Sequence, residues 1–207
     1  MEVICLDLEG VLVPEVWINV AINTGIEELK ATTRDIPDYD VLMRQRLDIL
    51  RKHKLTIKDI QSIIAGLKPF DGAFEFITWL RENFQVVILS DTFYNFASPL
   101  MKQLGYPLIL CHQLEVDSNG MVSDYILRQS HGKRESVIAF QSLNYKVFAA
   151  GDSYNDTEML SQADAGILFS PPENVIREFP QFSVTTNYFE LGAEFVKASN
   201  RKLNLFK

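Results

Sequence analysis

Short runs of hydrophobic residues recur along the chain, and segments with the hydrophobic period of a helix lie between them. Four such runs are candidate strands, at residues 3–6, 86–89, 147–150 and 166–169. Strands that are apolar at consecutive positions are typical of a parallel sheet covered on both faces. The segments with helical period predict crossover helices at residues 72–83, 94–104, 133–143 and 157–163. The pattern therefore predicts an α/β fold with a doubly wound parallel sheet.

This alternation stops directly after the first strand, between about Pro14 and Pro69. The period within this stretch predicts helices at residues 39–53 and 57–65, the second with a capping box of Thr56 and Asp59. We therefore expect a helical insertion over residues 14–69 in a Rossmann-like core formed by residues 1–13 and 70–207.

One charged residue breaks the pattern of the first of these two helices. Leu42 and Leu50 belong to its apolar face, and Arg46 projects between them, near the centre of that face. A buried guanidinium without a partner is very costly. Arg46 therefore needs an anion beside it.

A β-hairpin is expected near residues 117–129. Asn119-Gly120 favours a tight primed turn, and residues 125–129 have strand-like composition.

Acidic residues outnumber basic ones by 27 to 20, and the formal net charge is −7. A negatively charged surface repels nucleic-acid phosphates and anionic lipid headgroups alike. The sequence has no uncharged apolar run of membrane-spanning length, and Met1-Glu2 does not begin a basic signal-peptide region. We therefore expect a cytoplasmic globular protein with no nucleic-acid or membrane partner.

Acidic pairs follow two of the predicted strands. Asp7 and Glu9 follow the first strand and precede Gly10, whereas Asp152 and Asp156 follow the strand at 147–150. In parallel sheets ligands bind beyond the carboxyl ends of the strands. Carboxylates that are brought together repel one another unless a cation joins them, and Mg²⁺ suits such oxygen ligands. The alternatives are solvated loop charges for the first pair and helix capping for the second.

Two further segments are candidate phosphate contacts. Ser90-Asp91-Thr92 is expected at the opening of a helix, where a hydroxyl and backbone N–H groups can bind an anion, although these residues also cap helices. Lys133 and Arg134 begin a predicted helix, where cations oppose the dipole unless an anion is bound, and a solvated pair is the alternative. The three histidines, His53, His112 and His131, lack ligand spacing and are expected at the surface or at its boundary with the core.

Taken together, in this order, the four segments resemble the haloacid dehalogenase superfamily of phosphoryl-transfer enzymes. The resemblance implies that Asp7 is the nucleophile, Glu9 the general acid and base, Ser90 the phosphate-binding hydroxyl and Lys133 the phosphate-binding cation. It also implies a small cap domain after the first strand.

The same resemblance implies a Mg²⁺ cofactor. Its ligands would come from Asp7, the backbone carbonyl of Glu9 and Asp152, with Asp156 directly bound or acting through water.

Within the superfamily the chain is similar to phosphoserine phosphatases. This similarity implies that Arg46 pairs with the carboxylate and Glu15 with the ammonium of the amino acid. Asp91, beside Ser90, and Asn155 are then further substrate-binding residues.

The expected reaction is transfer of the phosphoryl group from phosphoserine to water through an aspartyl-phosphate. Most members have Asp where Glu9 stands, and Glu occurs in the branch that also transfers the phosphoryl group to homoserine. We therefore expect phosphoserine and homoserine as small-molecule partners. The alternatives are a phosphatase for another small phosphomonoester and a phospho-accepting switch module that resembles response-regulator receivers.

Overall fold

A seven-stranded sheet forms the centre of the computed structural model, which describes residues 1–32, 35–36 and 38–206. The strand order is β4-β3-β2-β1-β5-β6-β7, and only β3 and β4 pair in antiparallel fashion. The strands are β1 (Glu2–Leu6), β2 (Gln85–Phe93), β3 (Leu108–Val116), β4 (Val122–Ile126), β5 (Lys146–Gly151), β6 (Ala165–Phe169) and β7 (Ser183–Thr185). The predicted α/β class is confirmed.

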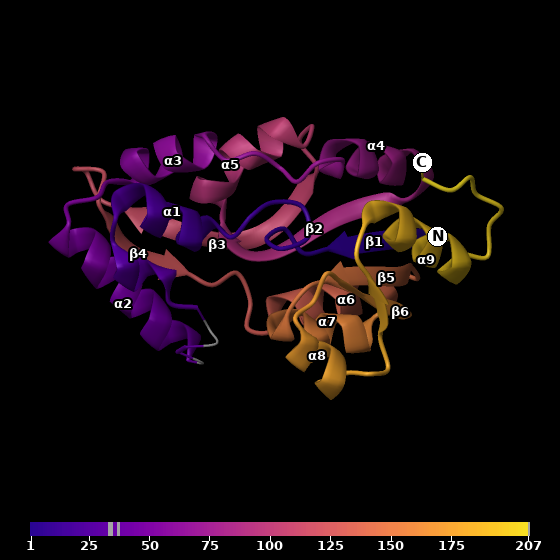
Figure 1. Ribbon diagram of the computed structural model, residues 1–207. Coiled ribbons are helices and arrows are strands. Elements are labelled where there is room, and N and C mark those ends of the chain that lie inside the picture. The colour runs from indigo at the N-terminus through magenta and orange to yellow at the C-terminus, as the bar shows by residue number, and fades with distance from the viewer. Residues whose placement is uncertain (33–34, 37, 207) are drawn as a thin grey trace.

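Helices cover both faces of this sheet, as the ribbon in Figure 1 shows. Those outside residues 14–69 are α4 (Ala73–Asn83), α5 (Tyr94–Gln103), α6 (Gly132–Ser142), α7 (Thr157–Gln162), α8 (Glu173–Glu178) and α9 (Tyr188–Ala198), with a short 3₁₀ helix, η2 (Tyr154–Asp156), before α7. The four predicted crossover helices are confirmed as α4, α5, α6 and α7, whereas α8 and α9 were not predicted.

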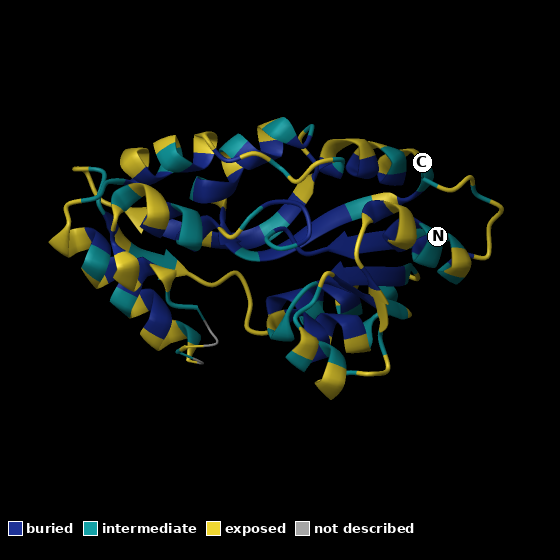
Figure 2. Cartoon of the chain, viewed as in Figure 1, coloured by how far each residue is buried: buried dark blue, intermediate teal, exposed yellow. Residues whose placement is uncertain are grey.

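The two faces of β1 belong to different hydrophobic cores. Ile4 and Leu6 pack into the larger core, and Val3 and Cys5 pack into the smaller one on the opposite face. This alternation follows from the period of two along a strand, and it leaves β1 buried on both sides (Figure 2). The sheet therefore holds the end of β1 in a fixed position.

The segment after β1 contains α1 (Val16–Thr24), a 3₁₀ helix η1 (Glu27–Lys30), α2 (Tyr39–Lys52) and α3 (Ile57–Ala65). The helical character of this insertion is confirmed, and its described residues contribute no strand to the sheet. The predicted capping box is present, because the Thr56 side chain accepts from the Asp59 N–H and the Asp59 carboxylate accepts from the Thr56 N–H. The domain boundaries at residues 14 and 69 stay a prediction.

The hairpin exists, but its predicted turn and second strand are wrong. The second strand is β4, and the first is β3. The Gly120 N–H donates to the Asp117 carbonyl at 3.0 Å, and Gly120 has a φ of 80° whereas Asn119 is not in the left-handed region. This geometry is a turn followed by a left-handed glycine, which suits a three-residue loop better than the two-residue primed turn.

The hairpin reaches the inserted helices and binds them. Arg44 of α2 pairs with Asp124 of β4 at 2.6 Å, and the N–H of Ile57 donates to the Gly120 carbonyl at 2.8 Å. These contacts hold the inserted helices against the sheet through a segment far away in sequence.

Within the described ranges, none of the helices has the length and apolar character needed to cross a membrane.

Candidate active site

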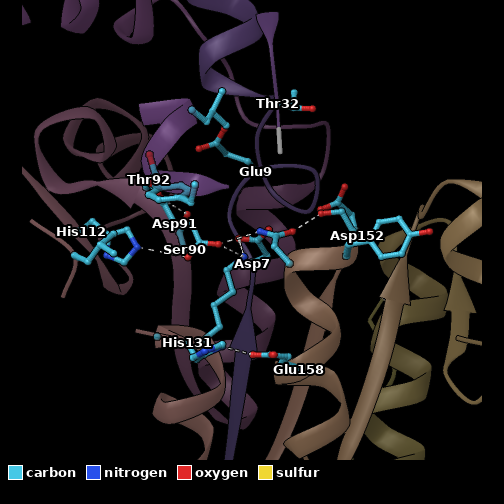
Figure 3. Close-up of a pocket in the computed structure, with 18 of the residues that line it drawn as sticks. Asp7, Glu9, Thr32, Ser90, Asp91, Thr92, His112, His131, Asp152 and Glu158 are labelled. Atoms are coloured by element: carbon cyan, nitrogen blue, oxygen red, sulfur yellow. Dashed lines mark hydrogen bonds and ion pairs between the residues drawn. The ribbon is translucent and has the colours of Figure 1, made fainter. Parts of the chain in front are cut away.

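A cavity of about 850 Å³ lies at the carboxyl ends of β1, β2 and β5. It is lined from the sheet side by Asp7, Glu9, Ser90, Asp91, Lys133, Asp152 and Asn155, and from the inserted helices by Glu15 and Arg46. In Figure 3, Asp7 lies between Asp91 and Asp152, and Glu9 lies on the side toward the inserted helices. The fold thus gathers these predicted site residues around one space, and Asp156 lies fully buried beside it.

The loop after β1 turns sharply and presents Asp7 to the cavity. The Asp7 N–H donates to the Ala150 carbonyl of β5 at 2.9 Å, which fixes the start of the loop. Gly10 has a φ of 79°, and a Cβ on it would lie 2.4 Å from the carboxyl carbon of Asp152. Glycine is therefore required here both by the turn and by the closeness of that carboxylate.

Lys133 is buried among three carboxylates. Its ammonium lies 2.7 Å from Asp156, 3.0 Å from Asp7 and 3.6 Å from Asp91. Burial alone lowers the pKa of Lys133, but these three charges outweigh burial and raise the pKa well above its ordinary value. Lys133 is therefore a permanent cation, which gives it a reason to begin α6 against the helix dipole.

Burial and the charge of Asp156 raise the pKa of Asp7 well above its ordinary range, although Lys133 acts in the opposite direction. The N–H of Leu8 donates to one oxygen of Asp7 at 2.7 Å and orients it. Among the described residues, the single ammonium of Lys133 does not balance the charges of the three carboxylates around it.

Asp156 is fully buried, and both of its oxygens accept hydrogen bonds. One accepts from the N–H groups of Asp152 and Ser153 at 2.9 and 3.1 Å, and the other accepts from Lys133. A Cβ on Gly151 would lie 2.3 Å from the carboxyl carbon of Asp156. Asp156 therefore holds the turn after β5 and orients Lys133.

The carboxylates of Asp7, Asp152 and Asp156 are able to hold a metal ion. Each offers an oxygen, and these oxygens all lie within 4.8 Å of one another. The donors are all hard, charged oxygens with an excess of negative charge, which is the chemistry that Mg²⁺ requires. The donor set fits the predicted ion.

The candidate phosphate-binding segment, Ser90-Asp91-Thr92, does not begin a helix as predicted. β2 continues through Ser90, Asp91 and Thr92 to Phe93, and its pairing with β3 shifts register between Leu89 and Phe93. The three polar residues thus lie on an irregular strand end. The amide of Asn155 donates to Asp91 at 3.0 Å and joins the segment to the turn after β5.

The prediction that His112 lies at the surface or its boundary is wrong, because it is buried, whereas His53 and His131 are exposed as predicted. The Nδ1 atom of His112 accepts from the Arg128 N–H at 3.1 Å, and its Nε2 atom lies 3.6 Å from Asp91. Burial alone raises the pKa of Asp91, but Lys133, His112 and Asn155 together hold it well below its usual range. The apolar run before His112 could have predicted this burial. It forms part of β3, which pairs with β2 and brings His112 to the sheet edge where Asp91 lies.

Glu9 lies beside the N-terminus of α1, where it accepts from the Val16 N–H at 2.8 Å. Burial and the nearby charge of Glu15 raise the pKa of Glu9 to about 8, although Val16 and Arg46 act in the opposite direction. Glu9 therefore holds a proton at neutral pH and can act as a general acid.

Arg46 is buried in the cavity wall, at 8% exposure, as the apolar pattern predicted. One terminal nitrogen donates to the Ala31 carbonyl at 3.0 Å, and the guanidinium lies 4.6 Å from the centre of the Trp17 ring. Burial lowers the pKa of Arg46 to about 10, so it stays charged at neutral pH. No ion pair joins it to a carboxylate in the described part of the chain, so an anion that binds in the cavity can complete its contacts.

Two curated relatives match this chain over almost its whole length. It is 67% identical over 205 residues to the phosphoserine phosphatase ThrH of Pseudomonas aeruginosa, covering 99% of this chain and 100% of that protein. It is 64% identical over 205 residues to a phosphoserine phosphatase of Pseudomonas syringae pv. tomato, covering 99% of this chain and 86% of that protein.

Solved structures share the fold. A substrate-bound phosphoserine phosphatase complex has a TM-score of 0.77 at 20% identity, covering 94% of this chain and 97% of that one. A phospho-aspartyl intermediate analogue of a phosphoserine phosphatase has a TM-score of 0.76 at 20% identity, covering 94% and 98%.

Residues 1–164 match the family of haloacid dehalogenase-like hydrolases. This match and the two relatives show that the chain belongs to the haloacid dehalogenase-like hydrolases and is an enzyme.

Proposed function

We propose that this enzyme transfers the phosphoryl group of O-phospho-L-serine to water, and also to L-homoserine, through an aspartyl-phosphate on Asp7. The observation that supports this most strongly is the presence of two incomplete charge sites in one cavity. Asp7 and Lys133 lie where phosphate chemistry requires a nucleophile and a cation, and the charged guanidinium of Arg46 forms no ion pair with a carboxylate of the described residues. A phosphorylated amino acid carries both of the anions that these sites would bind.

In the first step the Asp7 carboxylate attacks phosphorus, so an oxygen–phosphorus bond forms as the bond to the serine oxygen breaks. The Leu8 N–H and Lys133 orient the attacking carboxylate. Glu9 donates its proton to the departing serine oxygen, which leaves as an alcohol. The raised pKa of Glu9 keeps that proton available at neutral pH.

Asp7, the backbone carbonyl of Glu9 and Asp152 would hold Mg²⁺, and Asp156 would position this set through its hydrogen bonds to the turn. When bound, the ion neutralises negative charge on the phosphoryl oxygens.

The remaining residues bind the two ends of the substrate. Ser90, Lys133 and Asn155 would contact the phosphoryl group, with Asp91 holding the Asn155 amide in place. Arg46 would pair with the substrate carboxylate through its planar fork.

The ammonium of the amino acid would pair with Glu15, which lines the same cavity. In the second step Glu9, now ionised, takes the proton of the attacking water or alcohol. A bound alcohol held at attacking distance reaches an effective molarity of about 10⁵ M or more, far above that of water. Homoserine bound through Arg46 and Glu15 can therefore compete with hydrolysis. A cytoplasmic location belongs to the same proposal.

The sequence allowed two alternative functions. Membership of a hydrolase family excludes a switch module that only binds. The other alternative is a phosphatase for another small phosphomonoester. Such an enzyme would not need Arg46 to bind a substrate carboxylate.

The substitution Arg46→Ala tests the substrate. We expect kcat/KM for phosphoserine to fall about 10- to 100-fold, because a charge-assisted pair is worth roughly 1.5–3 kcal/mol. O-phosphoethanolamine lacks the carboxylate, and its kcat/KM is expected to stay within about twofold of wild type.

The matched control is Arg51→Ala on the same helix, whose side chain is exposed and pairs with Asp48 outside the cavity. It should affect neither substrate. Equal losses for both substrates in Arg46→Ala would contradict recognition of an amino acid.

The raised pKa of Glu9 predicts a pH dependence. The acid form of Glu9 carries the reaction, so kcat/KM for phosphoserine should fall about tenfold per pH unit above about pH 8. For p-nitrophenyl phosphate, whose leaving group needs little protonation, kcat/KM should not fall in the same range. Parallel profiles for the two substrates would show that Glu9 is not the acid.

Transfer to homoserine is tested by following both products. With enzyme, Mg²⁺ and phosphoserine, added L-homoserine should lower the release of free phosphate and produce O-phosphohomoserine, because the alcohol intercepts the phosphoenzyme. D-homoserine is the control, since its ammonium and carboxylate cannot match Glu15 and Arg46 in the same pose. Unchanged phosphate release without phosphohomoserine would reduce the activity to hydrolysis.

A further inference from the structure

Trp17 occupies a buried position in the cavity wall that the reaction described above does not explain. It lies on α1, is 8% exposed, and lines the cavity. One neighbour of its ring is the guanidinium of Arg46, 4.6 Å from the ring centre. Another is Phe96 of α5, whose ring meets it edge-on with centres 5.4 Å apart. Trp17 therefore contacts both the inserted helices and the helix that follows β2.

Arg46 itself has few contacts that would fix its orientation. One terminal nitrogen bonds to the Ala31 carbonyl, and the other lies 3.7 Å from the sulfur of Met43. Among the buried side-chain nitrogens and oxygens of the described residues, Nε of Arg46 alone lacks a hydrogen-bond partner. Hydrogen bonds thus hold two of the three guanidinium nitrogens, and the charges of Glu9 and Glu15 act on the cation from nearby. The face of Trp17 adds an aromatic contact to this cation.

Trp17 is in turn supported by the core. Phe96 is fully buried on α5, and its ring packs edge-on against Phe93 with centres 5.6 Å apart. Phe93 ends β2, the strand that carries Ser90. A continuous line of rings thus connects the end of the phosphate-binding strand to the guanidinium.

We propose that Trp17 is a positioning residue that holds the Arg46 guanidinium ready for a substrate carboxylate, and so determines the preference for phosphorylated amino acids over phosphorylated amines. Tryptophan has the aromatic face that attracts a cation most strongly, and the attraction increases where water is excluded. A receptor that is already oriented loses less conformational freedom when its ligand binds. This inference rests on the proposed function, because it takes Arg46 as the carboxylate receptor.

The test compares Trp17→Leu and Trp17→Phe on two substrates that differ by one carboxylate. In Trp17→Leu, kcat/KM for phosphoserine should fall about tenfold, mainly through KM, while that for O-phosphoethanolamine stays within about twofold. In Trp17→Phe, which keeps a smaller and weaker aromatic face, the loss for phosphoserine should be only about threefold. Turnover of phosphoethanolamine shows in each case that the variant is folded.

A double-mutant comparison separates positioning from packing. In an Arg46→Ala background, Trp17→Leu should cause no further selective loss for phosphoserine, because the group that it positions is absent. Equal losses for both substrates in the Trp17 variants, or no loss for either, would overturn the proposal. If Trp17→Leu does not fold, the selectivity of Trp17→Phe decides the question.

The outcomes also distinguish this proposal from the one on which it rests. If Arg46→Ala is selective for phosphoserine and the Trp17 variants are not, only the role of Trp17 is wrong. If Arg46→Ala affects both substrates equally, the proposed substrate class is wrong, and the role of Trp17 with it.

Discussion

The buried ammonium of Lys133 and the three carboxylates around it are the interaction on which the site depends. Asp7, Asp91 and Asp156 come from the ends of β1, β2 and β5, and Lys133 comes from the start of α6. Removing one partner of such a cluster would leave a buried charge uncompensated, which is strongly destabilising. The parallel topology is what brings the four side chains together, since the three strands end at one edge.

The excess of negative charge near Asp7 also explains why the site needs a cation. Among the described residues, a phosphate dianion would be repelled by the buried carboxylates of Asp7 and Asp156, which outnumber the one ammonium of Lys133 beside them. On the opposite wall Arg46 carries a positive charge that no ion pair within the described residues matches. A divalent cation and a doubly anionic amino-acid derivative would correct both imbalances.

Much of the fold and of the candidate site could be predicted from the sequence, because the residues that determine these features lie close together in the chain. The apolar runs of the central strands, the Thr56–Asp59 capping box and the glycine after Glu9 act within a few residues, and the structure confirms the elements that they predict. The burial of Arg46 could be predicted in the same way, because its position falls at the centre of the apolar face of α2.

The features that could not be predicted depend on contacts between segments that are far apart in the sequence. β3 was not predicted, although residues 108–111 are apolar, because its place in the sheet depends on pairing with β2 and β4. His112 faces Asp91 only because β3 lies beside β2. Likewise, the contact of Trp17 with Phe96 joins two helices that no local pattern relates.

The central claim is that Asp7 carries the phosphoryl group during turnover. Enzyme that is quenched with hydroxylamine while it turns over phosphoserine should yield a hydroxamate on the peptide that contains Asp7, because an acyl phosphate reacts with this nucleophile. Mass spectrometry of that peptide should show the modification only when both Mg²⁺ and phosphoserine are present. An unmodified Asp7 under steady turnover, or a phosphoryl group found on another residue, would contradict the account.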